Sequence, residues 1–142
     1  MFKPVRRSLP LYARDIMSTP AITAHEKTPL RELSKIMCDN RVGSVIIVGD
    51  DEKIRGIVTE RDIICAAGKA EATLDMPAWG FMTPDPVTVT PETPLTDVIE
   101  KMTDLGVRHM PVVDKDGKPL GMISARDIVA AMELFSKMFR GK

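Results

Sequence analysis

The chain contains an internal duplication. When the sequence is shifted against itself by 65 residues, residues 56–62 (GIVTERD) align with residues 121–127 (GMISARD) without a gap. In the same register, Thr28-Pro29-Leu30 aligns with Thr93-Pro94-Leu95. A gapless match of this length indicates one structural unit that is present twice, so the two copies should fold alike. A ligand bound by one copy therefore has a pseudo-symmetric counterpart position in the other.

The two copies begin with the same predicted elements. Each opens with a short extended run that ends at Thr23 or Thr88. A Thr-Pro pair follows, which is typical of a helix N-cap with proline at the first helical position. Apolar residues then recur at helical spacing, which predicts an amphipathic helix. These residues are Leu30, Leu33, Ile36 and Met37 in the first copy and Leu95, Val98, Ile99 and Met102 in the second.

A continuous apolar run follows this helix in each copy. Such a run, without alternation, predicts a strand that is covered on both faces. Polar turn residues separate it from a second strand, which leads directly into a second helix. The predicted unit is therefore β-α-β-β-α, and the fold class is α/β. The strands are expected at residues 45–48 and 54–58 and at 110–113 and 120–123, and the closing helices at 60–67 and at 125 to about 140.

The length of 142 residues leaves each copy too short to bury much surface alone. We therefore expect the two lobes to share a core. The predicted organisation is an N-terminal extension at residues 1–12, the first copy at 13–68, a linker at 69–77, the second copy at 78–133, and the end of the last helix with its tail at 134–142.

The strand-to-helix junction of each copy carries a polar motif. Asp62 follows Thr59 by three residues, and Asp127 follows Ser124 likewise, which is the spacing of a helix capping box with aspartate in place of glutamate. One interpretation is structural: the hydroxyl caps the helix, the carboxylate favours its positive end, and the preceding glycine permits a close turn. The other is functional, because a helix N-terminus suits a phosphate and a nearby carboxylate accepts hydrogen bonds from the hydroxyls of a ribose.

The order β-α-β-β-α, the Thr-Pro pair, the buried strand and the closing Gly-φ-φ-Thr/Ser-x-x-Asp motif (φ apolar) resemble the CBS domain, named after cystathionine β-synthase. The resemblance covers residues 13–133 and implies a stand-alone CBS pair, in which two repeats pack as a pseudo-two-fold module. In CBS pairs that bind adenosine nucleotides, the aspartate typically holds the ribose and the Thr or Ser lies near the phosphate. Base-contacting backbone is expected just ahead of the first helix.

The resemblance therefore implies a set of ligand-binding residues, with no catalytic residue and no metal ligand among them. The ribose contacts are expected from Asp62 and Asp127, and the phosphate contacts from Thr59, Ser124, Arg61, Arg126, Arg108 and His109. The base is expected near Thr23 and Thr88, against walls formed by Val45, Ile46, Met110 and Pro111.

The two copies differ in charge where the buried strand begins. Arg108-His109 precede the second strand, where basic residues contact phosphates in the nucleotide-sensing γ subunit of AMP-activated protein kinase. Gly43-Ser44 occupy the matching positions of the first copy, with Arg41 slightly earlier. Arg61 and Arg126 lie at helix N-termini, where a cation is mildly unfavourable, and this favours a functional reason for them. The second copy is predicted to be richer in phosphate ligands.

Composition narrows the function classes. Lys plus Arg and Asp plus Glu number 20 each, so the chain lacks the basic excess of a nucleic-acid-binding protein. The longest apolar stretches are too short to span a bilayer, and the N-terminus lacks a signal-peptide core, so we expect a soluble, cytoplasmic protein with no membrane partner. Cys38 and Cys65 match no metal motif and are expected to be buried, unpaired thiols.

The sequence has no nucleophile–base pair, metal-ligand cluster or Gly-rich phosphate loop, so we expect no enzyme. It predicts a regulatory sensor that binds an adenosine nucleotide, AMP first, in the cleft between the two repeats and needs no cofactor. The ligand is expected to favour one relative arrangement of the lobes, and this conformational shift to act on an unidentified partner. S-adenosylmethionine or methylthioadenosine is an alternative ligand, and a ligand-free structural dimerisation module is an alternative function. The last helix, with Ile128, Met132, Phe135 and Phe139, predicts a homodimer arranged as a disc of four repeats.

Overall fold

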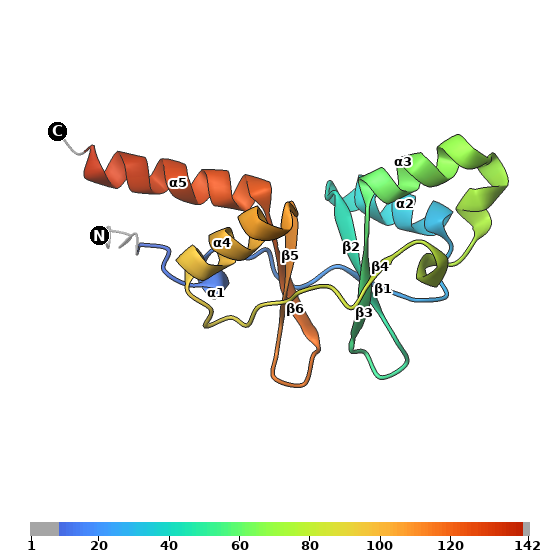
Figure 1. Ribbon diagram of the computed structural model, residues 1–142, viewed down its shortest axis with the longest axis horizontal. Helices are drawn as coiled ribbons and strands as arrows, with labels where there is room; N and C mark the ends of the chain where they lie inside the picture. The colour runs from blue at the N-terminus through green and yellow to red at the C-terminus, as the bar shows by residue number, and fades with distance from the viewer. Residues whose placement is uncertain (1–8, 141–142) are drawn as a thin grey trace, which may run out of the picture.

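A computed structural model describes residues 9–140, which form two lobes (Figure 1). Most of the predicted N-terminal extension and residues 141–142 of the tail lie outside the described residues. The first lobe contains β1 (Thr23–His25), α2 (Leu30–Asn40), β2 (Ser44–Val48), β3 (Ile54–Thr59), α3 (Glu60–Lys69), the 3₁₀ helices η1 (Glu71–Asp75) and η2 (Ala78–Gly80), and β4 (Thr83–Pro84). The second lobe contains α1 (Ala13–Ile16), α4 (Leu95–Leu105), β5 (His109–Val113), β6 (Pro119–Ser124) and α5 (Ala125–Phe139).

The two lobes repeat one strand register. In the first lobe the sheet order is β1-β2-β3-β4, with β1 parallel to β2 and the other pairs antiparallel. In the hairpins, Ser44 pairs with Thr59 and His109 pairs with Ser124, which are equivalent under the 65-residue shift. Each hairpin also has a register shift at the equivalent step. The predicted mixed α/β fold and its duplication are confirmed.

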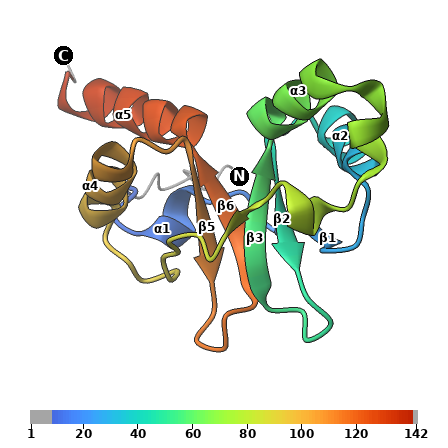
Figure 2. The ribbon, with the colours of Figure 1, turned by 45° about the vertical axis from the view of Figure 1, so that its right-hand side comes forward.

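The segment that precedes each repeat packs on the opposite lobe. On the second lobe, the Ala13 N–H donates to the Thr93 carbonyl at 2.9 Å, and Ser18 bridges to Met122 at the edge of β6. On the first lobe, Thr83 pairs with Ile57 at the edge of β3, which is the same contact shifted by 65 residues. The chain therefore crosses between the lobes twice (Figure 2), and neither repeat supplies every element of its own lobe.

Each lobe has its own hydrophobic core, so the predicted shared core is wrong. The amphipathic helices supply equivalent buried residues, Leu30, Leu33 and Met37 from α2 and Leu95, Val98 and Met102 from α4. The exchanged segments join the lobes instead, because Ala13 is buried in the core of the second lobe and Ala78 in that of the first. The small size of each repeat is thus compensated by a segment borrowed from the other.

Helices α2 and α4 begin one residue later than predicted. Pro29 and Pro94 are the N-cap residues, in extended conformation, and neither forms a side-chain cap hydrogen bond. The Thr93 hydroxyl instead accepts a hydrogen bond from the Thr90 N–H at 3.1 Å, so it orders the turn before the helix. The Thr-Pro pair therefore marks the approach to the helix.

Two predictions about buried surface are wrong. Cys38 and Cys65 are exposed, because each lies beside a buried position of its helix rather than on it. Ile128 and Phe135 pack against the second core and are not part of a free face of α5. The exposed apolar residues of the two closing helices are Ile64 on α3 and Val129, Met132, Met138 and Phe139 on α5.

Candidate functional site

Both strand-to-helix junctions form capping boxes. The Asp62 N–H donates to the Thr59 hydroxyl at 3.4 Å, and the Thr59 N–H donates to Oδ2 of Asp62 at 2.8 Å. At the second junction, the same bonds join Ser124 and Asp127 at 3.3 and 2.8 Å. The capping part of the structural interpretation is therefore correct in both copies.

The capping box uses one carboxylate oxygen of each aspartate. The Ser124 hydroxyl and N–H both donate to Oδ2 of Asp127, at 3.0 and 2.8 Å. Within residues 9–140, Oδ1 of Asp127 forms no hydrogen bond, and the same is true of Asp62. Capping therefore leaves Oδ1 of each aspartate without a partner in the described residues, so the structural and functional interpretations are compatible.

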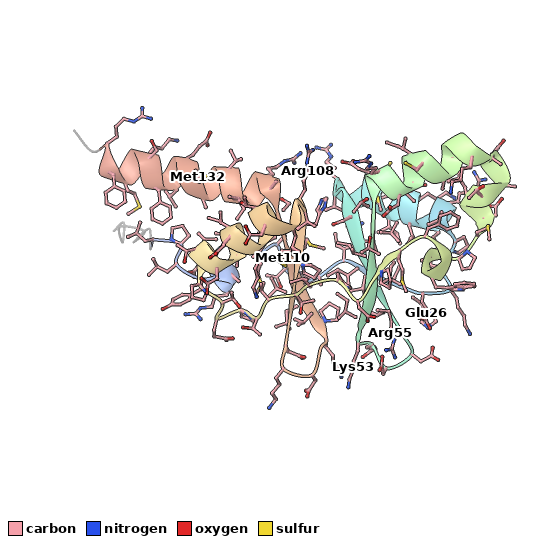
Figure 3. The ribbon with its side chains drawn as sticks, viewed as in Figure 1. Glu26, Lys53, Arg55, Arg108, Met110 and Met132 are labelled. Atoms are coloured by element: carbon pink, nitrogen blue, oxygen red, sulfur yellow. The ribbon has the colours of Figure 1, made fainter. Side chains whose placement is uncertain are left out.

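A cleft of about 550 Å³ opens between the lobes at the Asp127 junction. This volume is in the usual range of small-molecule sites, roughly 300–1,000 Å³. The second lobe contributes Arg108, His109, Ser124, Arg126 and Asp127 to its lining. The first lobe contributes residues 41–44, from the C-cap of α2 to the first residue of β2, together with Glu60. Figure 3 shows Arg108 where α3 and α5 begin, at the opposite end of the hairpins from Lys53.

The apolar part of the lining comes from residues that the sequence did not identify. Ile22, Val42 and Met122 line the cleft, and Ser18 and Pro20 of the first crossing segment lie beside them. The predicted base walls are elsewhere: Val45, Ile46, Met110 and Pro111 are buried, with Val45 and Met110 in the two cores. Thr23 and Thr88 are not part of the lining either, although Ile22 immediately precedes Thr23.

The cleft gathers arginines that have no carboxylate partner. Within residues 9–140, the ion pairs are His25–Asp50, Arg31–Asp75 and Arg55–Asp51, all outside the cleft. Arg41, Arg108 and Arg126 form none, even though Glu60 and Asp127 line the same cleft. Together with the positive end of the α5 dipole, this excess of unpaired positive charge favours an anionic ligand.

His109 stands between the two lobes. Its Nε2 is 3.5 Å from the position that a Cβ would take at Gly43, close to the Glu60 carboxylate. Burial lowers the pKa of His109, and Arg108 lowers it further, while Glu60 and Asp127 act in the opposite direction. His109 is therefore mainly neutral at pH 7, where it offers one donor and one acceptor.

The predicted contrast between Arg108-His109 and Gly43-Ser44 does not separate the two halves. All four residues line the same cleft, because the beginnings of β2 and β5 meet where the lobes join. Two other cleft residues differ in charge from their counterparts, which do not line the cleft. Arg41 corresponds to Gly106 and Pro20 corresponds to Asp85 under the 65-residue shift.

Thr59, Arg61 and Asp62 occupy the counterpart half and are not part of this cleft. The structure thus brings Ser124, Arg126 and Asp127 together with Arg108 and His109, and keeps the first-copy motif apart from them. Glu60 is the one residue of the first motif that reaches the Asp127 cleft.

The glycine of each motif has a role other than the predicted turn. A Cβ on Gly56 would lie 2.8 Å from the Thr83 carbonyl oxygen, and one on Gly121 would lie 2.6 Å from that of Ser18. Both glycines lie within strands, where a crossing segment passes directly over them. They are required because a side chain would displace the exchanged segment.

Two negative findings concern the described residues. Within residues 9–140, no three His, Cys, Asp or Glu side chains are grouped so that they could hold a metal ion. No helix in the same range is long and apolar enough to cross a membrane.

Sequence comparison identifies relatives of this chain. A protein of Acidianus ambivalens, described as an uncharacterized 17.7 kDa protein, is 32% identical over 117 residues, which are 82% of this chain and 70% of that protein. The L-aspartate semialdehyde sulfurtransferase of Methanocaldococcus jannaschii is 30% identical over 140 residues, or 99% of this chain. The match spans 25% of that enzyme.

Two solved structures have the same fold. The CBS domain pair of protein MJ0100, in complex with 5′-methylthioadenosine and S-adenosyl-L-methionine, superposes with a TM-score of 0.78 at 30% identity, covering 87% of this chain and 98% of that one. A CBS domain protein from Pyrobaculum aerophilum, complexed with AMP, gives a TM-score of 0.78 at 29% identity, with 88% and 98% covered. The model of the CBS domain matches residues 13–69 and again residues 78–134. The chain therefore belongs to the CBS-domain family and carries two copies of the domain.

Proposed function

We propose that this chain is a regulatory module that binds an adenosine nucleotide, AMP first, in the cleft at Asp127. One observation carries the proposal: the unpartnered Oδ1 of Asp127 and three unpaired arginines line one cleft. The carboxylate suits the two hydroxyls of a ribose, and the arginines with the start of α5 suit a phosphate. The adenosine compounds bound by the two similar structures support the choice of ligand class.

The cleft also provides a mechanism for regulation. Its walls come from both lobes, with Asp127 on one and Arg41 and Glu60 on the other. A ligand that contacts both walls stabilises one relative arrangement of the lobes, by no more than its difference in affinity between arrangements. We propose that a partner protein senses this arrangement and that the chain itself catalyses no reaction.

Isothermal titration calorimetry with adenosine, AMP, ADP, ATP, S-adenosylmethionine and methylthioadenosine tests the proposal. We expect AMP to bind, and Asp127→Asn to weaken it at least about tenfold, because hydrogen bonds to charged groups contribute about 1.5–3 kcal/mol. The asparagine carbonyl can still accept a hydrogen bond from the Ser124 N–H, so the cap is retained. The amide NH₂ group then takes the place of Oδ1, so an acceptor is replaced by a donor.

Asp62→Asn is the matched control, since it changes the equivalent carboxylate outside the cleft. We expect it to leave most of the AMP affinity at the Asp127 cleft unchanged. Absence of binding heat and of any rise in melting temperature with all six compounds would contradict the proposed function.

The alternative of an interaction module has its own supporting observation. Ile64, Val129 and Met132 are 69, 57 and 60% exposed on the two closing helices, and Ile64 and Val129 are equivalent positions. These helices begin at the same end of the molecule (Figure 2). We propose that this surface forms a homodimer, which is compatible with ligand binding. Sedimentation equilibrium at a protein concentration of about 100 μM measures the molecular mass in solution. The mass of a monomer under this condition would exclude a stable dimer.

A further inference from the structure

We propose that Arg41 makes the Asp127 cleft selective for adenosine ligands that carry a phosphate. In this proposal Arg41 contacts the phosphate from the first lobe while Asp127 holds the ribose on the second. It rests on the function proposed above, and it names the residue on which selectivity for a phosphate depends. Arg41 was not among the ligand-binding residues predicted from the sequence.

Arg41 has a backbone conformation that disfavours arginine. Arg41 is the C-cap of α2 and adopts the left-handed conformation, with φ 54° and ψ 44°. A side chain with a Cβ rarely adopts this conformation, and glycine is the usual residue at such a helix end. The counterpart in the second copy is indeed glycine, Gly106, with φ 63° and ψ 30°.

Left-handed backbone is not sufficient to mark a ligand-binding residue. Glu52 has φ 64° in the turn between β2 and β3, and its counterpart Gly117 has φ 84°. Glu52 does not line the cleft, whereas Arg41 does. The distinguishing observation is thus the position of the side chain: Arg41 is an exposed cation on the wall opposite Asp127.

The charge around Arg41 favours an anionic ligand. Within residues 9–140, Arg41 forms no ion pair, although the carboxylates of Glu60 and Asp127 line the same cleft. The cleft contains three arginines and two carboxylates. At the counterpart positions the balance reverses to two arginines and three carboxylates, because Gly106 replaces Arg41 and Asp85 replaces Pro20.

The guanidinium group fits this role for a geometric reason. Its planar donors can bind two phosphate oxygens at once, which a lysine ammonium group cannot reproduce. Arg108 and Arg126 line the same cleft from the second lobe, which is also the lobe of Asp127. Arg41 is the arginine that belongs to the other wall, and a phosphate bound to it connects the two lobes.

The test compares AMP with adenosine, which differ only by the phosphate, in calorimetric titrations of the full chain. For Arg41→Gly we expect the ratio of the adenosine Kd to the AMP Kd to fall about tenfold, with the adenosine Kd changed less than about twofold. Arg41→Lys should recover part of the ratio. AMP affinity should also fall more steeply with added salt in the parent protein than in Arg41→Gly.

Glu52→Gly is the matched control, because it places glycine at the other left-handed position of the first copy. Both glycine variants should melt no lower than the parent protein, and Glu52→Gly should leave both Kd values unchanged. An unchanged ratio in Arg41→Gly, or an equal loss of adenosine and AMP affinity, overturns the proposal while the proposed function stands. If the parent protein binds neither compound, this proposal is overturned, and the proposed function is overturned as well when the other four compounds also fail to bind.

Discussion

The two halves of this molecule have the same fold and different surfaces. Strand register, register shift and capping box recur at a constant shift of 65 residues. In contrast, many side chains differ between the halves, and two of the differences in charge involve the cleft: Arg41 and Pro20 line it, while their counterparts Gly106 and Asp85 do not. The duplication therefore fixes the scaffold, and our proposal assigns the difference in ligand binding to exposed positions such as Arg41.

Not every residue that differs between the two repeats distinguishes the two halves. His109 and Ser44 are equivalent positions that line the same cleft, so the difference between them does not distinguish the halves. Arg41 and Pro20 line the cleft while their counterparts Gly106 and Asp85 do not. Comparisons between repeats are informative about ligand preference at positions of this second kind.

The largest expected effect tests whether the halves are independent. Leu33→Ala in the first core should destabilise the protein by about 2–5 kcal/mol, because it leaves a cavity. Val98→Ala removes the equivalent residue of the second core. Since the exchanged segments join the lobes, both changes should shift one common unfolding transition.

The fluorescence of Trp79 reports the unfolding of the first lobe. Trp79 is the single tryptophan, and its backbone N–H donates to the Glu26 carbonyl on that lobe. Urea unfolding should be followed by Trp79 fluorescence and by far-UV circular dichroism. If Val98→Ala leaves the fluorescence transition unmoved, the lobes unfold separately and the interpretation of the exchange is wrong.

A smaller effect tests the two crossing segments against each other. Gly56→Ala and Gly121→Ala should each destabilise by about 1–3 kcal/mol through overpacking. Gly121→Ala should be the more severe, because its nearest contact is the backbone oxygen of Ser18 at 2.6 Å, while the nearest contact at Gly56 is the flexible Met82 side chain.

Chemical denaturation measures both effects, and Gly68→Ala on α3 is the control. A Cβ at Gly68 meets no atom within 4 Å, so alanine there should stabilise the helix by about 0.5–1 kcal/mol. Equal, negligible effects at Gly56 and Gly121 would show that the crossing segments can move away from the sheets.

The smallest effect concerns His109, which has Ser44 as its counterpart. Because burial lowers its pKa, the unfolded chain binds more protons than the folded one as the pH falls below about 6.5. His109 should therefore reduce the free energy of unfolding as the pH falls from 7 to 5. His109→Gln should lose stability less steeply over this range, and an identical slope in urea titrations would contradict the assignment.

Local sequence patterns predicted the parts of the structure that depend on nearby residues. The 65-residue shift located both hairpins, and the Thr59–Asp62 and Ser124–Asp127 spacings predicted both capping boxes. These features arise within a few residues, so periodicity and hydrogen-bonding capacity are sufficient to recognise them.

The exchange of segments depends on the path of the chain, which a repeat does not encode locally. A shift of the sequence against itself aligns Ser18 with Thr83 but does not say on which lobe either packs. For the same reason, the sequence did not identify Ile22 and Val42, which line the cleft, and it predicted base contacts from Val45 and Met110, which lie in the two cores. The buried strands are the more conspicuous apolar pattern, but a core residue has no free surface for a ligand.

The two crossings also have a mechanical consequence. Of all relative rotations of the lobes, one about the line through the two crossings would strain the crossing segments least. Figure 1 shows both crossings near the middle of the hairpins, between the end where α3 and α5 begin and the end with the turns. Closure around a ligand at the helix end would then act as a lever on the turns, where the Ile54 N–H donates to the Gly117 carbonyl at 3.0 Å.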